Sequence, residues 1–176
     1  MILTGPEIAG EVEAGRIVIS PFDHDQLNPN SYNYRLGPVL KVTDDTCLDP
    51  LVSSHWSEIT LLASGYVLLP DHLYLGSTME QLGSSFYVLS LIGRSSIGRL
   101  GMFLELSADM SNLGPAHCWT LEIKVVQPLR VYPGMRIGQV SFWQPHGSMK
   151  LYQGGYSGFS VPTPAQPPRT GTDKAS

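Results

Sequence analysis

Short runs in which apolar and polar residues alternate, mostly separated by Gly or Pro, dominate the chain and predict strands. By this pattern we expect strands over residues 16–20, 31–36, 39–42, 65–69, 73–78, 86–92, 102–107, 118–126, 129–132 and 136–143. One stretch departs from it, because Thr4 and Glu7 have the spacing of a helix capping box and Ile8 and Val12 follow four residues apart. The sequence therefore predicts a mainly β fold with one short helix over residues 5–14.

The composition is that of a turn-rich β domain. Gly and Pro contribute 18 and 14 of the 176 residues, and only 15% of residues are charged, against about 25% in a typical globular protein. Hydrophobic residues make up 42%, which is enough to form a core and excludes a globally disordered chain. A surface with so few charges also indicates that part of it is buried in an oligomer.

The formal net charge of -4 and the pI of about 5.6 argue against a nucleic-acid partner and against an anionic membrane. The two cysteines, Cys47 and Cys118, are too few for a disulfide framework or a zinc site, so we expect free thiols and a cytoplasmic location. No apolar run reaches the ~20 residues of a membrane span, and the first residues lack the features of a signal peptide. A small anionic ligand remains open, because a local group of arginines could hold it.

The segment Gly93–Arg99 (GRSSIGR) holds the densest set of anion-binding side chains and directly follows an apolar strand. Arg94 and Arg99 offer planar guanidinium donors, Ser95 and Ser96 offer hydroxyl donors, and the glycines allow close approach of the backbone. The segment fits either a phosphate or carboxylate site or a polar turn with solvated arginines, and the composition favours neither.

Glu122 stands in the otherwise apolar stretch 118–126, where strand alternation places Thr120, Glu122 and Lys124 on one face. It fits either an outward carboxylate paired with a cation, which the spacing favours, or a half-buried carboxylate suited to general acid–base catalysis. Glu105 has apolar neighbours without adjacent donors, so we expect it to be structural. The chain has no zinc-deaminase, P-loop, dinucleotide-binding or G-x-S-x-G signature.

Residues 154–176 are rich in Gly, Pro, Ser and Thr and have few large apolar side chains after Phe159. Composition alone favours a disordered tail over a segment that orders on a ligand. The packed domain is therefore expected over residues 1–153.

Four regions together resemble the dCTP deaminase branch of the trimeric dUTPase superfamily. They are the N-terminal GRIVISPF and NPNSYNYRLG (residues 15–22 and 28–37), LGSTME (75–80), GRSSIGRLG (93–101), and TLE followed by PGMRIGQ (120–122 and 133–139). The resemblance covers residues 1 to about 165. GRSS alone occurs across the superfamily, whereas GRSS with a downstream TLE is more specific to deaminases and to bifunctional deaminase–dUTPases.

The resemblance implies a distorted antiparallel jelly-roll or β-barrel of the dUTPase-like type over residues 1–153, assembled as a homotrimer with active sites between subunits. Residues 154–176 would then form a lid over the active site. The implied reaction is hydrolytic deamination of a cytosine deoxynucleotide, with dCTP as the expected substrate and dUTP and ammonia as products. The resemblance implies no zinc, and Mg²⁺ bound only through the nucleotide phosphates.

By the same resemblance, Glu122 would be the general base that takes a proton from the attacking water and returns protons to N3 and the leaving amine. Ser95 and the backbone carbonyl of Ala108 would position that water, and Arg99 would support Glu122 and Ser95, either in the same subunit or from a neighbouring one. Further nucleotide and phosphate contacts would come from Arg94, Ser96, Asn112, Tyr152, Tyr156 and Phe159.

Four positions depart from the family pattern. Asn33 stands where the family has the Asp of an S-Y-D motif, so a carboxylate is lost there. Asn112 stands where the family has the Asp that activates water for dUTP hydrolysis, which weighs against the alternative of a dUTPase-type or bifunctional pyrophosphatase. Gly155 and Phe159 replace a Lys and a Gln that help to hold the phosphates and sugar, which leaves the triphosphate preference open. A non-catalytic nucleotide-binding regulator would fit these losses but not the retained Glu122.

Overall fold

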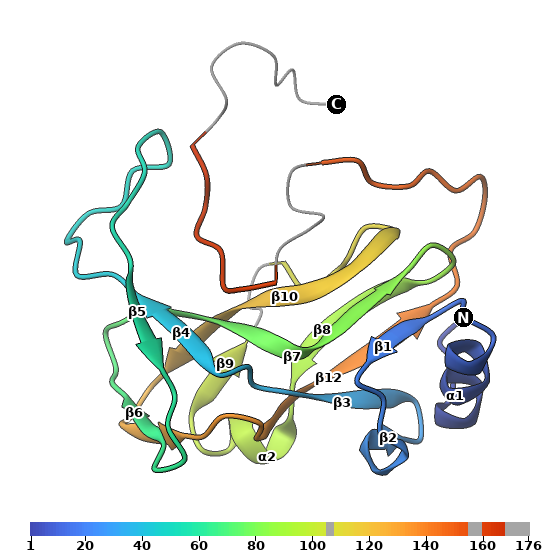
Figure 1. The fold of residues 1–176 in the computed structure, drawn as a ribbon, viewed down its shortest axis with the longest axis horizontal. Coiled ribbons are helices and arrows are strands. Elements are labelled where there is room, and N and C mark those ends of the chain that lie inside the picture. Colours follow the sequence, from blue (N-terminus) through green and yellow to red (C-terminus); the bar gives the residue numbers. More distant parts are fainter. Residues whose placement is uncertain (105–107, 155–159, 168–176) are drawn as a thin grey trace.

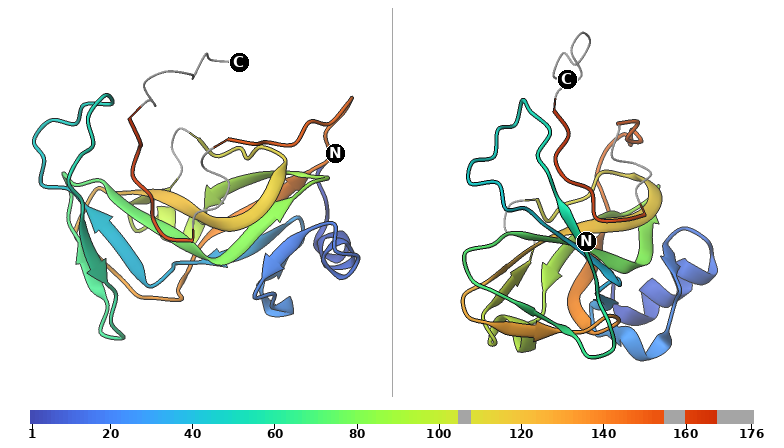
Figure 2. Two further views of the ribbon diagram at one scale, coloured as in Figure 1. Left: turned by 45° about the horizontal axis from the view of Figure 1, so that its top comes forward. Right: turned by 60° about the vertical axis from the view of Figure 1, so that its left-hand side comes forward.

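The fold consists of two larger β-sheets and a two-stranded sheet, and a computed structural model describes it for residues 1–104, 108–154 and 160–167 (Figures 1 and 2). The first sheet has the order β5-β4-β7-β10-β9, with β1 paired to β7. The second has the order β2-β3-β12-β8, and β11 pairs with β6. The pairings between these strands are antiparallel, which confirms the mainly β, antiparallel fold.

The strands and helices have the following bounds in chain order. They are α1 Gly5–Glu13, β1 Val18–Ser20, a 3-10 helix His24–Gln26, β2 Leu27–Asn28, β3 Ser31–Arg35, β4 Val39–Val42, β5 Ser57–Thr60, β6 Tyr66–Leu68, β7 Tyr74–Ser84, β8 Val88–Gly93, α2 Ser95–Gly98, β9 Met102–Leu104, β10 Gly114–Val125, β11 Leu129–Val131 and β12 Arg136–Trp143. The views agree that α1 lies at one side of the molecule and the loop before β5 at the other (Figures 1 and 2).

The core lies where the inward faces of the sheets meet. The last part of β10 and the strand β12 alternate as a half-buried strand should, with Leu121 and Ile123 of β10 and Val140 and Phe142 of β12 fully buried. Tyr34 of β3 is also fully buried and donates its hydroxyl to the carbonyl of Ile92. This packing fixes which face of β10 is left for other contacts.

Helix α1 occupies the predicted position and ends one residue earlier than predicted. Thr4 is its N-cap residue, but its side chain makes no capping hydrogen bond, so the capping box inferred from the spacing is not formed. The helix buries Ile8 and Glu11, and the Glu11 carboxylate accepts hydrogen bonds from Arg16 (2.6 Å from Nε) and from the Tyr87 hydroxyl (2.9 Å). Packing and this polar cluster hold the helix in place.

Strand lengths differ from the prediction where polar residues lie in a sheet. β5 was not predicted, since three of its four residues are exposed and only Ile59 is apolar. β7 continues six residues beyond the predicted end at residue 78 because Glu80 and Ser84 are buried on polar partners. β10 likewise begins before residue 118, and residues 105–107 of the strand predicted over 102–107 lie outside the described residues.

Two smaller predictions are confirmed: the cysteines are free, and a Pro-Gly turn precedes β12. Cys47 and Cys118 are free thiols. Gly134 has a φ of 75°, which the third residue of a type II Pro-Gly turn requires. Within the part of the chain that the structure describes, no helix combines the length and apolar character needed to cross a membrane.

Candidate active site

A cavity of about 490 Å³ lies along β10 and contains Glu122. Its wall is formed by β7 and β10, by the loop before β5 and by the C-terminal segment. The lining residues are Leu48, Trp56, Leu73, Leu75, Ala108, His117, Cys118, Trp119, Thr120, Glu122, Thr163 and Ala165. Figure 1 shows the C-terminal segment passing beside β10. Two of the four expected catalytic residues, Glu122 and Ala108, therefore share one cavity.

Strand alternation explains why Glu122 faces this cavity. Leu121 and Ile123, on either side of it, are fully buried in the core, so Thr120 and Glu122 are directed to the opposite face of β10. Both are half-buried and line the cavity, whereas Lys124 on the same face is exposed and lies outside the lining. Glu122 is thus a partly desolvated carboxylate at a concave site.

A second cavity of about 200 Å³ adjoins the first and contains two of the predicted nucleotide contacts, Asn112 and Tyr152. His117 and Trp119 line both cavities, so their side chains form the shared wall. The Tyr152 N–H donates to the carbonyl of Leu113 (2.8 Å), which anchors the start of the C-terminal segment beside this cavity. The lining of the second cavity includes no Lys or Arg among the described residues, so it suits an uncharged part of a ligand better than a phosphate.

The GRSS segment is separated from both cavities. Arg94 is the N-cap and Arg99 the C-cap of α2, whose buried residue Ile97 attaches this short helix to the core. Ser95, Ser96 and Arg99 are exposed and Arg94 is half-buried, and the four side chains line neither cavity. In the described part of one chain, the GRSS hydroxyls and guanidinium groups therefore lie outside the cavity lining that contains Glu122.

Tyr156 and Phe159, the remaining expected nucleotide contacts, lie outside the described residues, as do Glu105 and Gly155. Sequence reasoning missed His117 and Trp119, whose rings lie 4.4 Å apart between centroids. An aromatic pair two residues apart is a weak signal, because it also fits an ordinary buried strand.

Burial makes the His117–Cys118 part of the wall electrically neutral near neutral pH. It lowers the pKa of His117, although a hydrogen bond with the Pro115 carbonyl acts in the opposite direction. Burial, followed by the negative charge of Glu80, raises the pKa of the Cys118 thiol. Within the described residues, no group of three or more His, Cys, Asp and Glu side chains is arranged to hold a metal ion.

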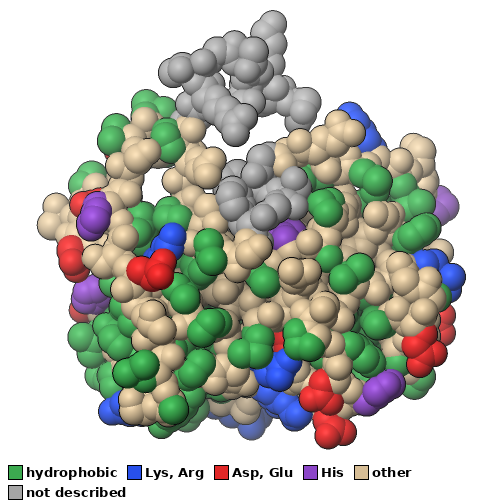
Figure 3. Space-filling model, in the orientation of Figure 1, with side chains coloured by type: hydrophobic (Ala, Val, Ile, Leu, Met, Phe, Trp, Pro, Cys, Tyr) green, Lys and Arg blue, Asp and Glu red, His purple; other side chains and the backbone are tan. Residues whose placement is uncertain are grey.

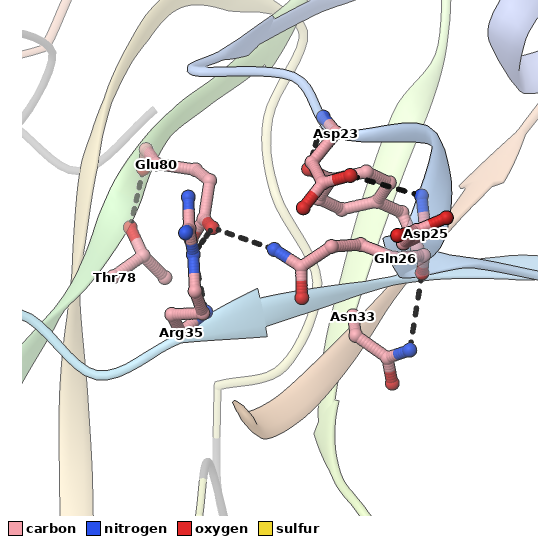
Figure 4. Close-up of polar contacts among 8 residues, drawn as sticks. Asp23, Asp25, Gln26, Asn33, Arg35, Thr78 and Glu80 are labelled. Carbon is pink, nitrogen blue, oxygen red and sulfur yellow. Dashed lines mark hydrogen bonds and ion pairs between the residues drawn. The ribbon is translucent and has the colours of Figure 1, made fainter. Parts of the chain in front are cut away.

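A buried ion pair between Arg35 and Glu80 stabilises β7, the strand that pairs with β10. Glu80 of β7 is fully buried, and its carboxylate accepts hydrogen bonds from the Arg35 N–H (2.9 Å), Arg35 Nε (2.6 Å) and Gln26 Nε2 (3.2 Å) (Figure 4). Thr78 donates its hydroxyl to the backbone carbonyl of Glu80 (2.7 Å). Because the carboxylate has three donors and a cation as a neighbour, its burial is compensated.

The comparisons with known proteins agree with this architecture. The family model described as "dCTP deaminase-like" matches residues 2–145. The chain belongs to the dCTP deaminase-like family. Membership confirms the resemblance inferred from GRSS and TLE, and with it the expected deaminase class of enzyme.

Several curated relatives carry the name "dCTP deaminase, dUMP-forming". The protein of Clostridium beijerinckii is 42% identical over 155 residues, covering 88% of this chain and 89% of its own. That of Cytophaga hutchinsonii is 43% identical with the same coverage. The product in these names is dUMP, which departs from the dUTP expected from the sequence.

A solved structure supports the fold alone. The 2'-deoxycytidine 5'-triphosphate deaminase of Agrobacterium tumefaciens matches with a TM-score of 0.66 and 24% identity. The match covers 82% of this chain, which spans about half (48%) of that solved chain. The match is consistent with the dUTPase-like fold expected for residues 1–153.

Proposed function

We propose that this chain hydrolyses dCTP to dUMP, pyrophosphate and ammonia, consuming two water molecules. The observation that carries the proposal is the identity of 42–43%, over 88% of the chain, to relatives named as dUMP-forming dCTP deaminases. It replaces dUTP as the expected final product and favours the bifunctional alternative. Asn112 cannot act as the base for the second water, the one that releases pyrophosphate. If pyrophosphate is released, another group must activate this water.

In the deamination step, Glu122 acts as the general base toward a water near C4 of cytosine. It takes a proton from that water as the C4–O bond forms, and it returns protons to N3 and to the amino group, which leaves as ammonia. Its half-buried position in the 490 Å³ cavity, with Ala108 on the same wall, supports this role. The Ala108 carbonyl accepts a hydrogen bond from the water and thereby orients it.

A complete site requires a second copy of the chain, because GRSS and Glu122 are separated within one copy. Large apolar side chains are exposed around the outer strand β9. They include Leu100 (48%) and Phe103 (42%), which follow α2 in the chain, and Val126 (62%), whose N–H donates to the carbonyl of Gly101. Figure 3 shows hydrophobic side chains lying between scattered charged ones on the face that it draws. The exposed apolar side chains around β9 support a homotrimer in which Arg94, Ser95, Ser96 and Arg99 of one subunit complete the cavity of another.

The nucleotide brings its own Mg²⁺ in this proposal, bound to the phosphate oxygens. The ion would reduce the negative charge that Arg94 and Arg99 must balance. The C-terminal segment acts as a lid, and the positions of Thr163 and Ala165 in the cavity wall support this role.

The proposal is tested by product analysis. Purified protein is incubated with dCTP and Mg²⁺, and ammonia, pyrophosphate, dUMP and dUTP are measured together. We expect equal amounts of ammonia, pyrophosphate and dUMP. Ammonia with dUTP would restrict the activity to deamination, pyrophosphate from added dUTP without ammonia from dCTP would indicate a dUTPase, and no turnover would overturn the proposal.

A further inference from the structure

Strand β10 presents nearly every residue of one stretch to the cavity. Five of the six residues from 117 to 122 line it, the exception being the buried Leu121. A regular strand turns alternate side chains to opposite faces, so it would present only half of them. The geometry of β10 must therefore change near Trp119.

The pairing of β10 with β7 shows the change. Cys118 pairs with Gln81 and Thr120 pairs with Ser77, so two steps along β10 correspond to four steps along β7. Irregularities of this kind re-aim side chains and are common beside active sites. Trp119 is the residue of β10 inside this irregular region.

Thr78 takes over the role of a strand carbonyl at this point. Its side-chain oxygen accepts the backbone N–H of Trp119 (2.9 Å), and its hydroxyl hydrogen is donated to the carbonyl of Glu80 (2.7 Å). Thr78 is 1% exposed, so a lost hydrogen bond would leave a buried N–H without a partner. The hydroxyl thus connects the two strands at the point where their register is irregular.

The indole of Trp119 is held at its other end too. Its Nε1–H donates to the carbonyl of Leu82 (3.0 Å), and the ring of His117 lies 4.4 Å away at an interplanar angle of 34°. The indole is therefore fixed, half-buried and in contact with both cavities.

We propose that Trp119 is a substrate-contacting residue on which the nucleoside part of the nucleotide packs, and that Thr78 is the residue that positions it. This inference rests on the proposed function, since it concerns the substrate of the same cavity. Trp119 lies three residues from Glu122, about 10 Å along the strand. A nucleoside whose C4 atom lies at the Glu122 carboxylate can therefore reach the indole of Trp119, because the two side chains extend from the strand toward it.

The side chains that line the two cavities favour contact with the uncharged nucleoside part of dCTP and not with its phosphates. The described lining of both cavities contains no Lys or Arg, and burial lowers the pKa of His117 and so disfavours its cationic form. An indole ring offers a flat apolar surface to a pyrimidine or to the sugar carbons. The guanidinium groups of the GRSS segment remain for the phosphates.

The role of Trp119 as a surface on which the nucleoside packs is tested directly with the variants Trp119→Ala and Trp119→Phe. We expect Trp119→Ala to raise KM for dCTP about 10-fold or more, and Trp119→Phe to raise it no more than about 3-fold, because a phenyl ring retains a stacking surface. In a Trp56→Phe/Trp143→Phe protein, Trp119 is the remaining tryptophan, and its emission under excitation selective for tryptophan should change on addition of dCTP. Because Trp56 also lines the cavity, ammonia release from dCTP first verifies that this protein still binds the nucleotide.

The positioning role is tested with Thr78→Val, which removes the hydroxyl at nearly constant volume, and Thr78→Ser, which keeps it. We expect Thr78→Val to raise KM about 5-fold or more with kcat within about 2-fold, and Thr78→Ser to restore KM to within about 2-fold of the wild type. Thermal unfolding identifies variants that fail to fold. If Thr78→Val does not fold, the Trp119 variants still decide the proposal, because their side chain lies at the cavity.

Wild-type KM with Trp119→Ala would overturn the inference, as would Trp119 emission that is unchanged at saturating dCTP. A folded Thr78→Val protein with wild-type KM would overturn the positioning role. Failure of the proposed function would instead be seen in the wild-type protein, as absence of ammonia release. The two failures are therefore distinguishable.

Discussion

The backbone N–H of Thr163 donates a hydrogen bond to Oγ1 of Thr120 (3.0 Å). Thr120 lies two residues before Glu122 on the cavity face of β10, and Pro162 beside Thr163 is buried. The C-terminal segment is thus attached to the strand that carries the proposed general base. This attachment places the described part of the segment where the proposed lid would cover a bound nucleotide.

The hydrogen bond between Thr163 and Thr120 should help to hold the nucleotide. We expect Thr120→Val to raise KM for dCTP about 3- to 10-fold, and Thr120→Ser, which keeps the acceptor, to stay within about 2-fold. Steady-state kinetics measure both. In a protein that ends at Gly154 and lacks the segment, Thr120→Val should have no further effect. A full effect in the shortened protein would contradict this role.

The Glu80–Arg35 ion pair should be a main source of stability. Glu80→Gln places an amide against three hydrogen-bond donors and leaves Arg35 without its counter-charge, so we expect unfolding to become easier by about 3–5 kcal/mol. Urea unfolding measures the change. Glu13→Gln, at an exposed position of α1, is the control and should change it by no more than about 0.5 kcal/mol. Equal effects would contradict the account.

The Glu11 cluster should make stability depend on pH. The hydrogen bond from Arg16 is the main cause that holds the pKa of Glu11 below its ordinary value of 4.5, with a further contribution from Tyr87. The stabilisation is therefore present above pH 4.5 and is lost as the pH falls through the lowered pKa. We expect Glu11→Gln to lower Tm at pH 7 and this difference to shrink as the pH falls below 4.5 and through the lowered pKa of Glu11. A difference that persists unchanged at the lower pH would contradict the assignment.

Sites shared between subunits should be recovered by mixing two inactive proteins. Glu122→Gln and Ser95→Ala proteins are unfolded, mixed in equal amounts and refolded together. If each site takes Glu122 from one copy and Ser95 from another, about a quarter of the sites in the mixture contain both native residues. We expect ammonia release to recover to roughly that fraction. Recovery to no more than the level of the separate proteins would show that each site lies within one chain.

Much of the β framework could be predicted because its strands follow simple alternation. Val39–Val42 and Arg136–Trp143 have the predicted bounds, since their apolar residues face a core and Gly or Pro precedes them. β5 was missed because an exposed outer strand needs few apolar residues. Thr4 also shows a limit of spacing, because a capping sequence does not ensure a capping hydrogen bond.

The candidate site was predictable in part. Alternation correctly places Thr120 and Glu122 on one face, and the family resemblance singles out Glu122 and Ala108, which line the same cavity. His117 and Trp119 could not be predicted, because they face the cavity through a change of register that depends on the buried hydroxyl of Thr78. No local sequence pattern records a contact between residues 41 positions apart.

The most direct test of the account is ammonia release from dCTP by Glu122→Gln, which preserves the shape of the side chain but removes its ability to accept a proton. Glu58→Gln, at an exposed position of β5, is the matched control. We expect Glu122→Gln to release ammonia at least about 100-fold more slowly than the wild type, with the control unchanged. Ammonia release by Glu122→Gln at the wild-type rate would contradict the central claim.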